Sequence, residues 1–166
     1  TVVVQIVDAF LYVAPSGSDA SSGSSWAEAK ATLQAAVDAS PPACTVLVSN
    51  GVYESGGRAI EGGPTNRVVL ARWVSLRSVN GPLVTTIRGF QGAIETGDFT
   101  SVRSAYLAPG ANLVGFTLTN GSTWWTGDQV RAQSGGGVWC ESPEALVTEC
   151  VITGNRAAWN GGGAYG

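Results

Sequence analysis

The side chains best suited to chemistry lie close together in one polar stretch, residues 121–137. It contains Trp124 and Trp125, followed by Asp128 and Arg131. Flat indole rings stack well on sugar faces, while a carboxylate and a guanidinium supply charge and hydrogen bonds. These four residues form the predicted ligand-binding site, and Asp128 and Arg131 are also candidate catalytic residues. The alternative is that at least one indole folds back over the protein, since neighbouring side chains of an extended segment point in opposite directions.

The other charged side chains form no recognisable catalytic motif. Glu141 and Glu144 enclose a Ser-Pro pair typical of a solvated turn, and Glu149 lies in a predicted strand, pointing outward, with Arg156 nearby in sequence. Asp98 has no evident partner. If the strands stack, a further set of arginines would form a ladder on one face: Arg58, Arg67, Arg72, Arg77, Arg88 and Arg103.

Three cysteines, Cys44, Cys140 and Cys150, lie within apolar or β-branched runs. Their spacing matches no metal-binding pattern, so no metal site is predicted. They are interpreted as buried free thiols, with a Cys140–Cys150 disulfide as the alternative if the two strands become neighbours. The chain contains no histidine to activate a thiol, which argues against a catalytic cysteine.

The composition favours one β-rich domain and disfavours several kinds of partner. The 166 residues include 23 glycines but only 13% charged residues, which suits short strands joined by many turns. The net charge is −3 and no cluster of Lys or Arg occurs, so neither nucleic acid nor an anionic membrane surface is an expected partner. No apolar run reaches the roughly 20 residues of a transmembrane helix.

One helix is predicted, over residues 26–39. Ser25 and Glu28 have the spacing of a capping box, apolar residues recur at helical intervals, and Pro41 stops the pattern. Before it, residues 1–13 hold two strand-like apolar runs, followed by a loop of turn-forming residues. This helix is expected to cap the array of strands that follows.

From Cys44 onward, short strands alternate with turns. The predicted strands are 44–49, 67–71, 73–78, 85–89, 104–107, 112–119, 138–140 and 146–153. Longer loops are expected at 54–66, 90–104 and 120–137.

An internal repeat indicates how these strands are arranged. Residues 116–121 (FTLTNG) recur 34 positions later as 150–155 (CVITGN), and 135–140 (GGGVWC) recur 26 positions later as 161–166 (GGGAYG). Because each unit holds short strands and no helix, the repeat predicts stacked turns of a β-solenoid. A β-propeller is the competing architecture, but it needs four hairpin-linked strands per blade. The repeated glycines are predicted corners with positive φ, since no phosphate-loop lysine or helix follows them.

An ordered set of short motifs extends from about residue 11 to the end of the chain. They are YVAPSGSD at 12–19, GSSWA at 23–27, TLQAAV at 32–37, TVLV at 45–48, GVY at 51–53, LVGFTLTNG at 113–121 and GGGV at 135–138. In this order they resemble bacterial pectate-lyase-like right-handed β-helix proteins. The resemblance implies an extracytoplasmic β-helix. Enzymes of that group act on polysaccharides: lyases use an Arg or Lys base with Ca²⁺, and hydrolases use paired carboxylates.

We therefore expect an all-β fold, a right-handed parallel β-helix with a short N-terminal capping α-helix, formed as a single domain by residues 1–166. Residues 1–43 would supply the N-terminal strands, loop and capping helix, and residues 44–166 the coils. The sequence stops within a repeat. We expect either the N-terminal part of a longer solenoid or an open edge covered by another subunit.

Three functions fit these expectations. The first is a secreted or cell-surface module, structural, adhesive or carbohydrate-binding, whose partner is a polysaccharide or cell-surface glycan. The alternative is a polysaccharide lyase or glycoside hydrolase acting on an acidic polysaccharide. A second alternative is a structural subunit that self-associates through its open C-terminal β-edge. No cofactor is expected, and Ca²⁺ only if the chain is a lyase.

Overall fold

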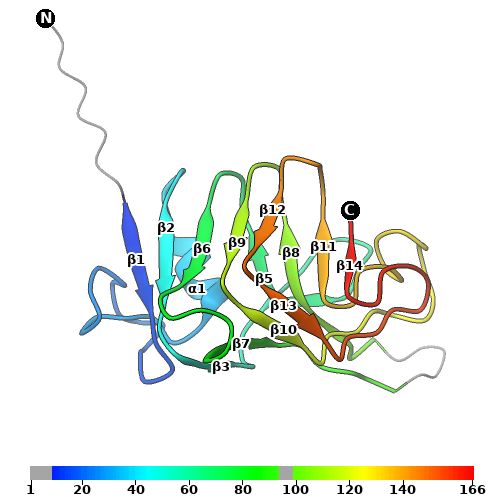
Figure 1. The fold of residues 1–166 in the computed structure, drawn as a ribbon, viewed down its shortest axis with the longest axis horizontal. Coiled ribbons are helices and arrows are strands. Elements are labelled where there is room, and N and C mark those ends of the chain that lie inside the picture. The colour runs from blue at the N-terminus through cyan, green and yellow to red at the C-terminus, as the bar shows by residue number, and fades with distance from the viewer. Residues whose placement is uncertain (1–8, 94–98) are drawn as a thin grey trace, which may run out of the picture.

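The chain folds as a parallel β-solenoid. The computed structural model describes residues 9–93 and 99–166, in which strands from successive turns of the chain stack into three sheets (Figure 1). The first predicted apolar run, residues 1–7, and Asp98 lie outside the described residues. Apart from one short helix the regular elements are strands, so the predicted all-β, parallel β-helix fold is confirmed.

Each of the three sheets takes a strand from every turn of the chain, and sheets A and C each include one further strand. Sheet A has the order β1 (Phe10–Val13), β2 (Thr45–Val48), β6 (Ser75–Ser78), β9 (Asn112–Val114) and β12 (Leu146–Thr148). Sheet B has the order β3 (Gly51–Tyr53), β7 (Thr85–Arg88), β10 (Thr117–Thr119) and β13 (Val151–Thr153). Sheet C has the order β4 (Arg58–Ala59), β5 (Thr65–Leu70), β8 (Val102–Leu107), β11 (Val138–Cys140) and β14 (Ala164–Tyr165).

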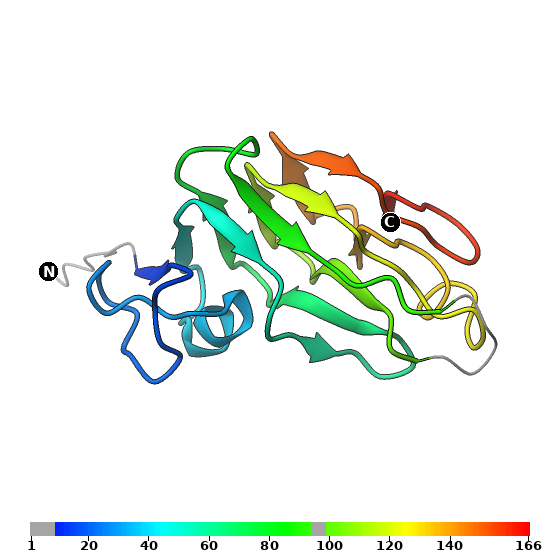
Figure 2. The same cartoon turned by 90° about the horizontal axis from the view of Figure 1, so that it is seen from below.

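One turn of the solenoid, here called a coil, runs through sheets A, B and C in that order. The described residues form four coils: β2-β3-β5, β6-β7-β8, β9-β10-β11 and β12-β13-β14. All strand pairs are parallel except β4 with β5. Figure 2 shows the same stack from below, with β1 and the helix at the N-terminal end.

In-register apolar side chains fill the interior. Each sheet contributes at least one inward row. These rows include Val46, Leu76, Leu113 and Val147 from sheet A; Tyr53, Ile87, Leu118 and Ile152 from sheet B; and Val68, Ala105 and Val138 from sheet C. Side chains of alternate residues point inward because the strand period is two, so stacking keeps like residues above one another.

The helix α1 (Leu33–Ala39) is shorter than predicted, and the expected start at residue 26 is wrong. Ser25 Oγ does accept from Glu28 N, at 3.3 Å, but this closes an isolated turn. The backbone of Lys30 is extended because it pairs with β1, donating to Tyr12 O and accepting from Ala14 N. The helix therefore begins only after Thr32, whose hydroxyl caps it.

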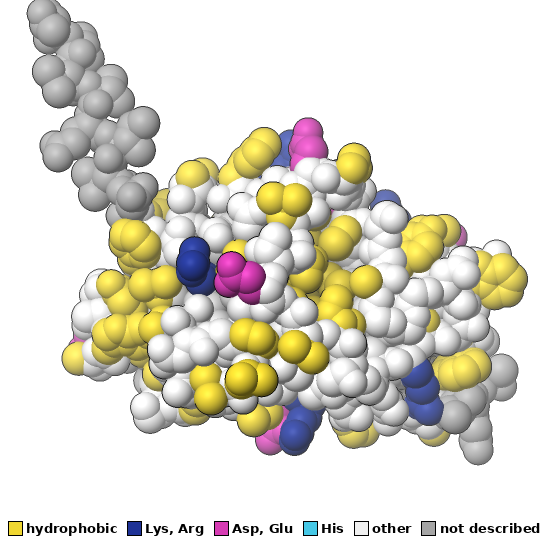
Figure 3. Space-filling model, viewed as in Figure 1, with side chains coloured by type: hydrophobic (Ala, Val, Ile, Leu, Met, Phe, Trp, Pro, Cys, Tyr) yellow, Lys and Arg dark blue, Asp and Glu magenta, His cyan; other side chains and the backbone are white. Residues whose placement is uncertain are grey.

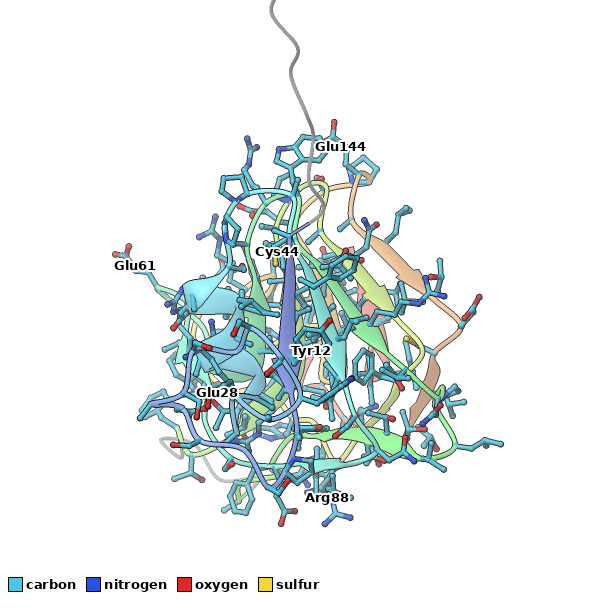
Figure 4. All side chains as sticks on the ribbon, turned by 90° about the vertical axis from the view of Figure 1, so that its left-hand side faces the viewer. Tyr12, Glu28, Cys44, Glu61, Arg88 and Glu144 are labelled. Atoms are coloured by element: carbon cyan, nitrogen blue, oxygen red, sulfur yellow. The ribbon has the colours of Figure 1, made fainter. Side chains whose placement is uncertain are left out.

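The N-terminal end of the stack is closed by backbone and side-chain hydrogen bonds. Gly23 and Lys30 pair with the outer edge of β1, and Gln34 of α1 bonds to both the N–H and the C=O of Val69 in β5. Figure 4 looks onto this end, with Tyr12 of β1 at its centre and α1 beside it. The predicted capping role is thus carried by the helix together with the loop before it.

The predicted strands 112–119 and 146–153 are each two strands joined by a corner. Gly115 (φ 80°) separates β9 from β10, and Glu149 (φ 54°) separates β12 from β13. Glu149 is therefore a corner residue, which corrects its predicted place within a strand. The residues that follow, Phe116 and Cys150, point inward and continue the apolar pattern across each bend. The spacing of apolar residues therefore does not reveal the bends.

The repeated glycines lie where successive coils touch. Gly135 and Gly161 have φ values of 70° and 61°, as predicted for corners, but the prediction of positive φ is wrong for Gly136, Gly137, Gly162 and Gly163. Gly136 has a different reason for being glycine, because a Cβ there would lie 2.0 Å from Arg156 O in the next coil. These positions require glycine because of the close approach of neighbouring backbones as well as because of backbone conformation.

All three cysteines in the chain are free thiols. Cys44 is fully buried, and burial raises the pKa of each thiol above its ordinary value. Cys150 contacts the backbone of the preceding coil, where Phe116 N donates to its sulfur at 3.4 Å. The prediction of free thiols is confirmed, and the alternative Cys140–Cys150 disulfide does not form; the predicted burial is confirmed for Cys44, whereas Cys140 and Cys150 are only partly buried.

The C-terminal end of the stack exposes core-type side chains. A hollow of about 360 Å³ is lined by Val138, Cys140, Ala145, Val147, Ile152, Ala164, Tyr165 and Gly166. Both sequence-based alternatives for this end, a longer solenoid or another subunit, stay predictions. Within the described residues no helix is long and apolar enough to cross a membrane.

The predicted arginine ladder is wrong, because its members belong to different sheets. Arg77 lies on β6 of sheet A and Arg88 on β7 of sheet B, whereas Arg67 and Arg103 lie on sheet C. Arg103 is 2% exposed and donates to four oxygens: Gly135 O, Asn66 Oδ1, Arg131 O and Ser134 O. It joins the residue 121–137 loop to β8. Burial lowers the pKa of Arg103 to about 10, so it remains a cation at neutral pH.

Replacing Arg103 should unfold the protein more easily than replacing an exposed arginine. Arg103→Met leaves three oxygens of buried hydrogen bonds without their donor, each costing about 1–3 kcal/mol, together with the partly buried Arg131 O. We expect a loss of at least about 3 kcal/mol, or a Tm lower by about 6–12 °C. Arg77→Met, on an exposed residue of β6, is the control and should change stability by less than about 0.5 kcal/mol. Equal thermal unfolding of the two variants would contradict this role.

A second, smaller cluster lies on the outer surface of sheet C. The rings of Tyr106 and Trp139 stack at 5.0 Å and those of Trp139 and Tyr165 at 6.4 Å, with Val69 at the N-terminal end of the row. Trp139 Nε1 donates to Val130 O, so the loop covers this row. Burial, followed by the charge of Glu141, raises the pKa of Tyr106 to about 12.

This pKa predicts an alkaline loss of stability. A free tyrosine titrates near pH 10, so the folded protein holds the Tyr106 proton more tightly than the unfolded chain does. The resulting stabilisation is complete below about pH 10 and is lost as the pH rises through about 12. Urea unfolding at several alkaline pH values should show a steeper decline for the wild type than for Tyr106→Phe. Parallel declines would show that Tyr106 is not the responsible group.

Candidate functional site

Both tryptophans of the predicted site lie against the protein. The Trp124 ring meets Phe99 edge-to-face at 4.8 Å, and the guanidinium of Arg156 lies 5.9 Å from the ring centre of Trp125. Both indoles are partly buried. Neither Nε1–H has an acceptor among the described residues. The structural alternative thus holds for both rings, although each keeps an accessible part.

Asp128 and Arg131 lie in the same loop but make no ion pair among the described residues. Asp128 Oδ1 accepts from Val130 N at 3.0 Å and from Arg131 N at 2.7 Å, which closes the tip of the loop. The Arg131 carbonyl accepts from the buried Arg103, while the Arg131 residue is exposed. Asp128 therefore shapes the loop, and the structure does not bring these two residues together as an acid–base pair.

A further tryptophan, which was not predicted, lies next to the loop. Trp159 lies 34 positions after Trp125, one repeat later, and its backbone N–H donates to Gln133 O of the loop. Trp159 is 56% exposed and Phe99 is 55% exposed. We call Phe90, Phe99, Trp124, Trp125, Arg156 and Trp159 the aromatic corner. The 34-residue repeat, which relates Trp159 to Trp125, could have been used to predict it.

A charged groove adjoins this corner. It has a volume of about 660 Å³ and is lined by Glu54, Ser55, Arg67, Arg88, Gly89, Phe90, Val102 and Asn120. Arg88 Nη1 and Glu54 Oε2 form an ion pair at 3.0 Å, with both side chains about half exposed. Figure 4 shows Arg88 at the lower edge of the end-on view, projecting from the stack.

Arg67 is the buried cation of the charged groove. It is 8% exposed, and its guanidinium donates from Nε to Arg88 O and from Nη1 to Gly56 O. Burial lowers the pKa of Arg67 and the charge of Glu54 raises it in part. Two arginines and one glutamate leave the groove with one net positive charge.

Phe90 connects the charged groove to the aromatic corner. Its backbone pairs with Val102 in both directions, at 2.9 and 2.8 Å, and Ser122 N donates to Val102 O at the start of the loop. Arg156 then ties the corner together by donating to Gly92 O and to Ser122 Oγ. Sequence reasoning missed the groove because its charged residues come from three separated segments that only the coil register brings together.

The surface around these sites carries few charges. On the face drawn in Figure 3, Lys, Arg, Asp and Glu side chains are scattered among hydrophobic and neutral ones. Within residues 9–93 and 99–166, no three acidic or cysteine side chains come together as potential metal ligands. The charged groove and the aromatic corner together offer cationic hydrogen-bond donors and aromatic rings.

No protein-family model, curated protein or solved structure matches the chain.

Proposed function

We propose that this chain is a secreted or cell-surface β-helix module that binds an acidic polysaccharide without cleaving it. The observation that carries the proposal is the continuity of the charged groove with the aromatic corner through Phe90. Cations beside flat rings match a polymer whose sugar units have an apolar face and a carboxylate. The resemblance to pectate-lyase-like proteins supports the same ligand class and an extracytoplasmic location.

The charges of the groove favour an anion. Arg67 is held by two backbone carbonyls, so its cation is fixed in place before any ligand arrives. Arg88 is paired with Glu54, but this ion pair is half exposed and therefore weak, so Arg88 is available to a carboxylate. A guanidinium binds a carboxylate through two parallel hydrogen bonds, which gives direction as well as charge.

The rings of the aromatic corner would extend the binding surface beyond the groove. Phe90, Phe99 and Trp159 are each about half exposed, so each leaves part of its ring accessible to a ligand. Trp124 meets the Phe99 ring edge-to-face, and Trp125 lies against the guanidinium of Arg156. Rings that are already fixed by protein contacts lose little entropy when a sugar stacks on them.

A lyase is the second candidate, and Arg67 is the observation that favours it. Its pKa is lowered by burial, in the direction that a base requires. However, the two carbonyls that accept its N–H groups stabilise the protonated form and oppose this use. We therefore favour binding over cleavage.

The first test removes the accessible cation of the groove. Arg88→Gln should weaken binding of an oligogalacturonate about tenfold, since a hydrogen bond to a charged group contributes about 1.5 kcal/mol or more. The affinity should also depend less on salt. Arg77→Gln, on another sheet, is the control and should bind like the wild type. Calorimetry measures the affinity, and a rise in ultraviolet absorbance from unsaturated sugar products would establish the lyase instead.

The second test removes an exposed ring. Trp159→Ala should weaken binding about 2- to 12-fold, which corresponds to about 0.5–1.5 kcal/mol for one aromatic contact. Its thermal stability should stay close to that of the wild type because the side chain is largely exposed. Trp26→Ala, an exposed tryptophan at the N-terminal end, is the matched control. Equal affinities of the two variants would remove Trp159 from the binding surface.

A further inference from the structure

Four tight turns lie one above the other where the chain enters sheet A. Each is closed by a hydrogen bond from its fourth N–H to its first C=O, in the turns 41–44, 71–74, 108–111 and 142–145. In Figure 4, Glu144 of the last turn lies at the top and Cys44 of the first turn lies above the centre, whereas Arg88 lies at the opposite, lower edge of the stack. This row is therefore well separated from the charged groove.

Trp73 occupies the third position of the second turn in a strained conformation. Its φ is 62°, in the left-handed region, and the corresponding residue of the next turn is Gly110, with φ 74°. A bulky aromatic residue is rare in this region, where glycine or asparagine is favoured. Since Trp73 is 57% exposed, burial explains little of its presence. Ala43, the third residue of the first turn, has the same conformation (φ 59°), so the turn imposes it, and a large ring at this position adds a steric cost.

The indole of Trp73 forms a wall of a small surface slot. The slot has a volume of about 290 Å³, with Pro41 and Pro42 of the preceding turn and Arg72 also in its lining. On the C-terminal side the ring packs on Gly110, where an added Cβ would lie 2.4 Å from Trp73 Cε3. Gly110 is outside the lining of the slot. It supports the ring and leaves the slot open.

The charge of the slot is positive. Arg72 is exposed and makes no hydrogen bond or ion pair with the residues that the structure describes. The lining contains no acidic residue, so nothing within the slot neutralises this cation. A flat indole beside an unpaired guanidinium matches a ring that has an apolar face and an anionic substituent.

We propose that Trp73, Arg72 and the two prolines form a second binding site, which takes a single pyranose ring bearing a carboxylate or sulfate. The sugar class rests on the function proposed above, whereas the location does not. The slot is at the small end of ligand-sized pockets, which limits it to about one ring. A long polymer or two separate glycans could then contact opposite edges of the stack.

The stability of Trp73→Asn separates a ligand residue from a structural one. Asparagine accepts the left-handed conformation, so the turn should persist and Tm should change by less than about 3 °C. A tryptophan needed for packing would instead lower Tm by about 6–20 °C. Trp139→Asn, at a buried tryptophan, should show that large loss. A large loss for Trp73→Asn would overturn the proposal.

Binding is best tested with the groove site removed. In the Arg88→Gln/Trp159→Ala protein, titration with a uronic-acid disaccharide followed by NMR should show residual binding that Trp73→Asn reduces at least tenfold. Trp26→Asn is the control and should leave it unchanged. Titrations with a sulfated and a neutral disaccharide show which substituent the site prefers. If the neutral disaccharide binds as tightly as the uronic-acid disaccharide, the role of Arg72 is overturned.

The outcomes distinguish the two proposals. If the wild type binds saccharides but the double variant does not, the Trp73 site is wrong and the groove stands. If the double variant binds as well as the wild type and loses binding with Trp73→Asn, the Trp73 site stands and the groove is wrong. If the wild type binds no saccharide, both proposals fail.

Discussion

Hydrogen bonding between the backbones of successive coils is the constraint on which this structure depends. A parallel strand satisfies its polar groups only when a strand lies on each side, so every coil requires a neighbour. At the N-terminal end the loop before α1 and the side chain of Gln34 take the place of that neighbour. The same requirement excludes a Cβ at Gly136, where the backbone of the next coil is too close. Coil geometry is thus fixed mainly by the backbone.

Side-chain hydrogen bonds then hold the loops to this regular stack. Arg103 reaches from β8 to three carbonyls of the residue 121–137 loop, and Asp128 closes the tip of that loop. Arg156 holds the segment after Phe90 by donating a hydrogen bond to Gly92 O. These buried or half-buried polar contacts give irregular segments a defined shape, so that aromatic side chains from separate loops lie on one surface. Function in such a fold depends on loops that a rigid stack positions.

Local patterns predicted most of the fold. Alternating apolar residues and the 34-residue repeat located the strands and the parallel stack, because both follow directly from strand geometry. The start of α1 was missed because the backbone of Lys30 pairs with β1, a tertiary contact that overrides local helix signals. The bends at Gly115 and Glu149 were missed because the apolar pattern continues through them. For the site, sequence reasoning found the tryptophans of the loop. The groove of Glu54, Arg67 and Arg88 depends on coil register, which no local pattern contains.

The closed N-terminal edge also gives the stack a direction of growth. Gly23 and Lys30 cover β1, and Gln34 covers β5 at Val69, so the residues that close this end all lie within the first 70 or so residues of the chain. Each later coil then adds to a finished edge, with contacts to the coil just before it and few to distant ones. Synthesis from the N-terminus would present the coils in this same order. A length change at one coil would therefore alter how far the stack extends while leaving the earlier coils as they are.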